Sequence, residues 1–101
     1  MQSPKHLNVS EEALAAVCAS FQVQELAVFG SAARGELQPE SDIDLLVLFG
    51  EEVPVTLFTL IELQAELTDL FARRVDLVPK NGLKAVLRRE VLAEAQVLYA
   101  A

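Results

Sequence analysis

The sequence has few of the residues that build disulfide-bonded, membrane-spanning or nucleic-acid-binding proteins. Its one cysteine, Cys18, excludes an internal disulfide and a cysteine-based zinc cluster. No apolar run is long enough to span a bilayer, and the first residues lack the apolar core of a signal peptide. Eight basic against 15 acidic residues give a net charge of −7, whereas nucleic-acid binding draws on clustered positive charge. We therefore expect a cytoplasmic protein with no direct binding to nucleic acid or membrane.

The chain contains enough apolar side chains for one hydrophobic core. It has 101 residues, of which 52% are hydrophobic, and this predicts a single domain over residues 1–101. The excess of acid suits a basic partner or a metal ion, but it equally suits simple solubility.

Hydrophobic periodicity predicts helices that alternate with strands. Ser10 is the expected N-cap of a first helix. Further helices are expected at 56–72 and 83–95, and strands at 25–29, 42–49, 74–78 and 97–99, the last at an edge. The alternation indicates an α/β layer structure, and the order of the elements leaves open whether the sheet is parallel or mixed.

Three aspartates lie in or beside the predicted strands. Asp42 and Asp44 point the same way, because side chains alternate along a strand. Asp76 interrupts the apolar run 75–78, where a carboxylate is costly to bury unless it is paired or bound to metal. Protonation of one acid or a hard divalent ion such as Mg²⁺ would relieve their repulsion. The alternatives are solvated loop acids for the Asp-x-Asp pair and an outward acid on an edge strand for Asp76.

Gly30 and Ser31 follow the first strand and open a short helical turn that runs to about Arg34. Glycine lets a ligand approach the backbone closely, and free N–H groups at a helix start attract phosphate. A plain turn capped by Ser31 is the alternative, and Arg34 could reach a phosphate or be solvated. A phosphate-binding turn beside three acids that could hold two metal ions predicts transfer of a nucleotidyl group, with pyrophosphate leaving.

The spacing of these motifs is similar to that of a known superfamily. Gly30-Ser31, ten residues and then Asp42-x-Asp44 resemble the signature of the DNA-polymerase-β-like nucleotidyltransferases. The strings at 29–35, 41–47, 73–78 and 83–95 resemble the minimal nucleotidyltransferase (MNT) branch. The resemblance implies a nucleotidyltransferase α+β fold, with a small mixed sheet of three to four strands flanked by helices.

The resemblance also implies the roles of the site residues. Gly30 and Ser31 would contact the triphosphate of ATP, and Arg34 is a further candidate. Asp42 and Asp44 would hold metal ions, with two Mg²⁺ expected. Asp76 would be the third acid of the metal site and would help to activate the attacking hydroxyl.

The implied function is that of an antitoxin that transfers AMP from ATP to a tyrosine of a HEPN-type ribonuclease toxin encoded nearby, in a homo- or hetero-oligomer. One alternative is a binding module that neutralises its partner by contact. Another is a transferase acting on a small molecule, against which the absence of a helical substrate domain argues.

A basic cluster could steer triphosphate or an acidic partner surface, or be ordinary helix-surface charge; it comprises Lys80, Lys84, Arg88 and Arg89.

Overall fold

The computed structural model describes residues 9–36, 38, 40–83 and 85–101. Its elements, in chain order, are α1 (Glu11–Ser20), β1 (Val23–Phe29), β2 (Ile43–Phe49), α2 (Leu57–Phe71), β3 (Val75–Pro79), the 3₁₀ turn η1 (Lys80–Gly82), α3 (Ala85–Glu94) and β4 (Gln96–Ala100). Each predicted element is present, with ends that differ by one or two residues. The structure describes nothing of Lys84, one member of the predicted basic cluster.

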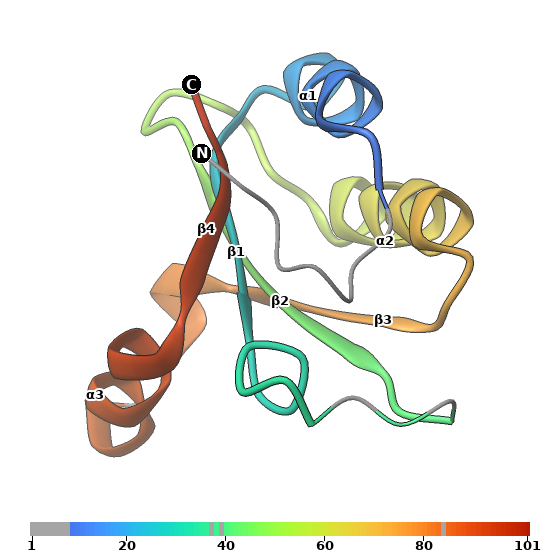
Figure 1. Ribbon diagram of the computed structural model, residues 1–101. Helices are drawn as coiled ribbons and strands as arrows, with labels where there is room; N and C mark the ends of the chain where they lie inside the picture. The colour runs from blue at the N-terminus through green and yellow to red at the C-terminus, as the bar shows by residue number, and fades with distance from the viewer. Residues whose placement is uncertain (1–8, 37, 39, 84) are drawn as a thin grey trace.

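The four strands form one mixed sheet in the order β3-β2-β1-β4 (Figure 1). β1 is antiparallel to both β2 and β4, whereas β2 is parallel to β3. A parallel pair needs a crossover connection, and α2 supplies it between β2 and β3. The expected small mixed sheet flanked by helices is therefore confirmed.

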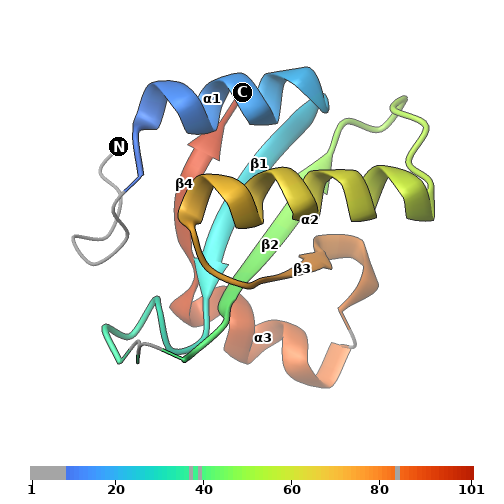
Figure 2. The same ribbon diagram turned by 90° about the vertical axis from the view of Figure 1, so that its right-hand side faces the viewer.

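The hydrophobic core lies between the sheet and the two helices α1 and α2, which cover the same face (Figures 1 and 2). Alternate residues of β2 and β3 point into it. The most deeply buried large side chains come from both layers and include Leu14, Leu26, Ile43, Leu45, Leu63 and Leu67. We call this side of the sheet the packed face.

Local signals in the sequence explain where the helices of the packed face begin and end. The Ser10 hydroxyl accepts a hydrogen bond from the Ala13 N–H at 3.3 Å and caps α1. Thr56 and Thr59 exchange side-chain-to-backbone bonds of 3.2 Å at the start of α2. Helix α2 ends at Ala72, which adopts the left-handed conformation with φ of 54°. Among the described residues, no helix is long and apolar enough to cross a lipid bilayer.

The opposite face of the sheet, which we call the open face, carries the acids. Helix α3 lies on this side, against β1 (Figures 1 and 2). Asp76 is exposed, as expected for an outward acid on an edge strand. The reason is topological, because β3 is an edge strand and only its Val75 and Leu77 face the packed side.

Candidate nucleotidyl-transfer site

Parallel pairing of β2 and β3 brings together acids that are distant in the sequence. Asp44 and Asp76 are direct partners in the register of the two strands, so their side chains leave the same face side by side. Asp42 lies just before β2, two residues from Asp44, and is exposed. The structure thus places Asp44 and Asp76 side by side on the open face, with Asp42 just before β2 and close enough for its charge to affect Asp44.

The carboxylates affect one another through their charges. Burial raises the pKa of Asp44 above its ordinary value, and the neighbouring carboxylates of Asp76 and Asp42 raise it further. Arg34 opposes this rise, whereas a fourth acid, Glu94, adds to it. Asp44 is therefore the electrostatic centre of the site, where a cation or a proton would relieve the accumulated negative charge.

Gly30 lies directly against this acidic centre. It follows the last residue of β1 and has φ of 72°, a conformation that a residue with a Cβ rarely adopts. A Cβ at this position would overlap the Asp44 carboxylate and lie 3.2 Å from its Cγ. The close approach of the turn to the acids therefore requires glycine.

The turn after Gly30 is closed by backbone hydrogen bonds. The Arg34 N–H donates to the Gly30 carbonyl at 3.2 Å, and the Glu36 N–H donates to the Ser31 carbonyl at 2.8 Å. The predicted short helical turn is thus a hydrogen-bonded turn, in which Ser31 is partly buried. It ends at Gly35, which also has φ of 72°.

Arg34 and Glu94 complete the set of charged side chains around the turn. Arg34 donates from Nη1 to Glu94 at 2.9 Å and from Nε to Glu36 at 3.0 Å. The other Glu94 oxygen accepts the Gly30 N–H at 3.0 Å. The hydrogen bond from Arg34, together with that from Gly30, lowers the pKa of Glu94. Sequence reasoning missed Glu94, because its partners lie 60 and 64 residues earlier in the chain.

The donor set suits a hard cation, although the described side chains do not form a complete cage. No group of three or more His, Cys, Asp or Glu side chains in the described part of the chain is arranged to hold a metal ion. Asp44 and Asp76 nevertheless provide two adjacent carboxylates. Mg²⁺ typically binds through one or two carboxylates and takes its other oxygen ligands from water and substrate phosphates. The pair therefore fits an ion that arrives with a triphosphate.

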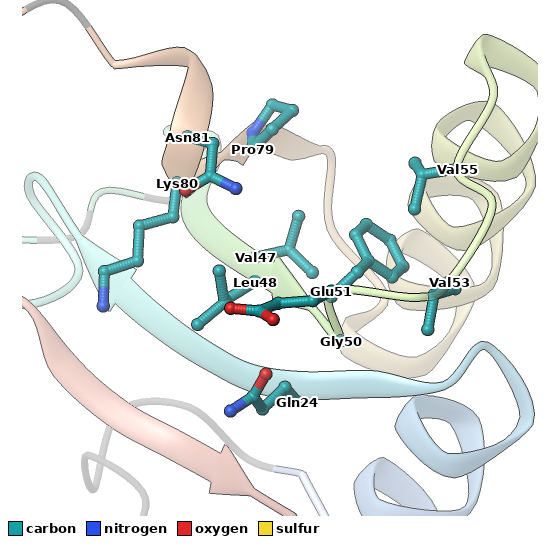
Figure 3. Close-up of a pocket in the computed structure, with 11 residues that line it drawn as sticks. Gln24, Val47, Leu48, Gly50, Glu51, Val53, Val55, Pro79, Lys80 and Asn81 are labelled. Atoms are coloured by element: carbon teal, nitrogen blue, oxygen red, sulfur yellow. The ribbon is translucent and has the colours of Figure 1, made fainter.

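Two hollows in the surface differ in their relation to the acids. One of about 310 Å³ lies beside Asp42 and is also lined by Ser41, Arg73 and Arg74. Another, of about 460 Å³, lies over the far end of β2, between Lys80 and its neighbours on one side and the 53–55 segment on the other (Figure 3). It is lined by Val47 to Glu51 rather than by the start of β2, so we assign the chemistry to the acids and not to this larger hollow.

The predicted basic cluster is not a single unit in the structure. Lys80 pairs with Glu25 at 3.4 Å on the far part of the open face. Arg88 and Arg89 are exposed on α3. The steering role considered for these residues remains a prediction.

A comparison with protein families identifies the chain. The model of the nucleotidyltransferase domain family matches residues 10–98. The chain belongs to this family. As a nucleotidyltransferase it also resembles the protein adenylyltransferase MntA of Thermococcus cleftensis, with 49% identity over 74 residues that cover 73% of each chain.

Solved structures of similar fold extend the comparison. A candidate minimal nucleotidyltransferase superposes with a TM-score of 0.73 at 43% identity, over 85% of this chain and 86% of the other. A chain of a toxin–antitoxin complex crystallised with AMP-PNP gives 0.75 at 24% identity, over 92% and 75%. A chain from a complex of a tri-AMPylated HEPN toxin of Shewanella oneidensis with its MNT antitoxin gives 0.65 at 22% identity, over 90% and 70%.

Proposed function

We propose that this nucleotidyltransferase transfers AMP from ATP, with Mg²⁺, to a tyrosine of a HEPN-type toxin and so acts as its antitoxin. The observation that carries the proposal is the pairing of Asp44 with Asp76 directly beside the Gly30 turn. That arrangement provides an anionic centre for metal-bound phosphates next to a backbone turn that a ligand can approach closely.

The proposed reaction is an in-line displacement at the α-phosphorus of ATP. The tyrosine hydroxyl oxygen forms a bond to that phosphorus while the bond to the bridging oxygen of the β-phosphate breaks. Pyrophosphate leaves with the electron pair of the broken bond, and the hydroxyl proton passes to the Asp76 carboxylate. Asp76 suits this role because its exposed position lets an acceptor from another chain reach it.

The proposed division of labour among the residues follows their positions. Asp42, Asp44 and Asp76 would hold Mg²⁺, which stabilises the attacking and leaving oxygens when it is bound. Ser31 and the N–H groups of its turn, together with Arg34, would bind and orient the phosphates. Arg34 is suited to this because its guanidinium, half exposed at 48%, lies beside the turn.

The choice of nucleotide and partner is supported by the relatives. The MntA relative is named as a protein adenylyltransferase, and the complexes of similar fold contain AMP-PNP or an AMPylated HEPN toxin with its MNT antitoxin. A toxin bound next to an exposed Asp76 would supply the tyrosine that this chain does not itself present to the acids.

The test is transfer of label from α-³²P-ATP to a co-expressed HEPN-type protein encoded beside this chain. Asp76→Asn keeps nearly the same size and removes the proposed base, so we expect labelling to fall by about 10²–10⁴-fold while the complex still forms. The matched control is Asp69→Asn on α2, an exposed acid of the other layer, which should label as wild type does.

The same experiment separates the alternatives. If Asp76→Asn protects cells from the toxin as well as wild type while it transfers no label, neutralisation occurs by contact, and the proposal that AMP transfer causes it is wrong. If wild type labels no protein but modifies a small hydroxyl compound, the acceptor in the proposal is wrong.

A further inference from the structure

Glu94 is the most remote of the residues that contact the phosphate-binding turn. It is the last residue of α3, yet its carboxylate spans two groups of the turn: the Gly30 N–H at 3.0 Å and the Arg34 guanidinium at 2.9 Å. A second bond joins the same regions, because the Gln96 side-chain amide donates to the Ala33 carbonyl at 2.7 Å. The junction of α3 and β4 is therefore fastened to the turn at both of its ends.

The position of Glu94 has an electrostatic cost for the site. Its negative charge adds to the rise in the pKa of Asp44, and it partly neutralises the Arg34 guanidinium, which opposes that rise. A solvated glutamate at a helix end would carry no such cost. The hydrogen bonds from Arg34 and Gly30 lower the pKa of Glu94, so they stabilise its charged form in this position and join the two groups through it.

The effect of these hydrogen bonds is visible in the geometry of Arg34. A free arginine side chain has many rotamers, and a ligand that has to order it binds more weakly for that reason. Here Glu94 accepts a hydrogen bond from Nη1 of the guanidinium, and Glu36 accepts one from Nε. A guanidinium has five N–H donors, so three remain that can face a phosphate. The ordering is thus already present before a ligand arrives.

From this geometry we infer that Glu94 is a positioning residue for nucleotide binding: it fixes Arg34 and the Gly30 turn in the arrangement that receives the triphosphate. The inference rests on the proposed function, since it assigns the turn to phosphate. It differs from a helix-capping or general stabilising role, because it predicts a change in ATP affinity at temperatures where every variant is folded.

The test is calorimetric titration of the full chain with ATP and Mg²⁺, well below the melting temperature of each variant. Glu94→Ala should weaken binding by about twofold to tenfold, the factor that corresponds to ordering one long side chain. Glu94→Gln should fall between wild type and Glu94→Ala, because its amide oxygen can still accept the Gly30 N–H. Glu90→Ala removes an exposed carboxylate one turn earlier on α3 and should bind as wild type does.

Two results would overturn the inference alone. Tighter binding by Glu94→Ala would mean that the carboxylate competes with phosphate for the turn. Unchanged affinity with a lowered melting temperature would mean that Glu94 only stabilises the fold. Absence of any ATP binding by wild type would instead overturn the proposed function, and the inference with it.

Discussion

The two faces of the sheet differ in what they contribute. On the packed face, α1 and α2 bury nearly every apolar side chain of the core, including Leu63 and Leu67 at 0% exposure. On the open face, the same strands carry Asp44 and Asp76 side by side, and Asp44 has a raised pKa. Alternation along β2 and β3 therefore divides the molecule into a face that stabilises it and a face that accumulates negative charge. The acids of the open face therefore need not contribute to the stability of the fold.

The largest expected effect lies on the packed face. Leu63→Ala leaves a cavity between α2 and the sheet and should lower the free energy of unfolding by about 2–5 kcal/mol. Leu57→Ala, on the same helix but 71% exposed, should change it by less than about 0.5 kcal/mol. Urea unfolding followed by circular dichroism measures both. Equal losses for the two variants would contradict the division of the helix into a buried and an exposed side.

A smaller effect is expected where the open face meets the turn. Gly30 and Gly35 both have φ of 72°, but only at Gly30 would a Cβ meet another group, the Asp44 carboxylate. Gly35→Ala should therefore lose only the backbone preference, about 1–2 kcal/mol. Gly30→Ala should lose more than this and should also weaken ATP binding. Thermal melts and ATP titration of the pair measure the difference, and identical behaviour would show that the turn and Asp44 do not press together.

The smallest effect on stability is expected at the acidic centre around Asp44. Here the substitution should stabilise the protein, whereas the substitutions above should destabilise it. Because the folded state raises the pKa of Asp44, the unfolded chain releases this proton at a lower pH than the folded one. The contribution of Asp44 to the stability of the folded state is fully present below the ordinary aspartate pKa of about 3.9. It is lost as the pH rises through the raised pKa of Asp44 in the folded protein. Asp44→Asn should therefore raise the melting temperature at pH 7 in chelator.

The control for this effect is the same melt at a pH below about 3.9, where Asp44 is protonated and the variant should match wild type. Asp69→Asn should show no gain at either pH. A variant that melts lower than wild type at pH 7 would mean that the ionised carboxylate supports the fold.

Much of the site could be predicted because its motifs are local. Gly30 with Ser31, and Asp42 with Asp44, sit at fixed spacing at the ends of two strands, and strand alternation alone puts the two acids on one side. Their common location with Asp76 needed more. It depends on β3 pairing parallel to β2 in one register, which the order of the elements leaves open.

Two features could not be settled from the sequence. The residues around Asp76 fit a strand, but whether that strand lies at the edge, with Asp76 pointing outward, is decided by the pairing of the whole sheet. Glu94 carries no local mark, since a glutamate at a helix end is ordinary and its partners are 60 and 64 residues away. Hydrophobic periodicity does not reveal contacts between residues so far apart in the sequence.

Because the parts of the site lie far apart in the sequence, they are synthesised at different times. Asp44 cannot meet Asp76 until α2 has crossed from β2 to β3, and Glu94 cannot reach the turn until α3 has emerged. At about 5–20 residues per second, the roughly 50 residues from Asp44 to Glu94 take roughly 3–10 s to synthesise. During that interval the turn at Gly30 has its own backbone hydrogen bonds but lacks its contact with Glu94. The proposed nucleotide site is thus complete only once Glu94 has been synthesised, after most of the core residues already exist.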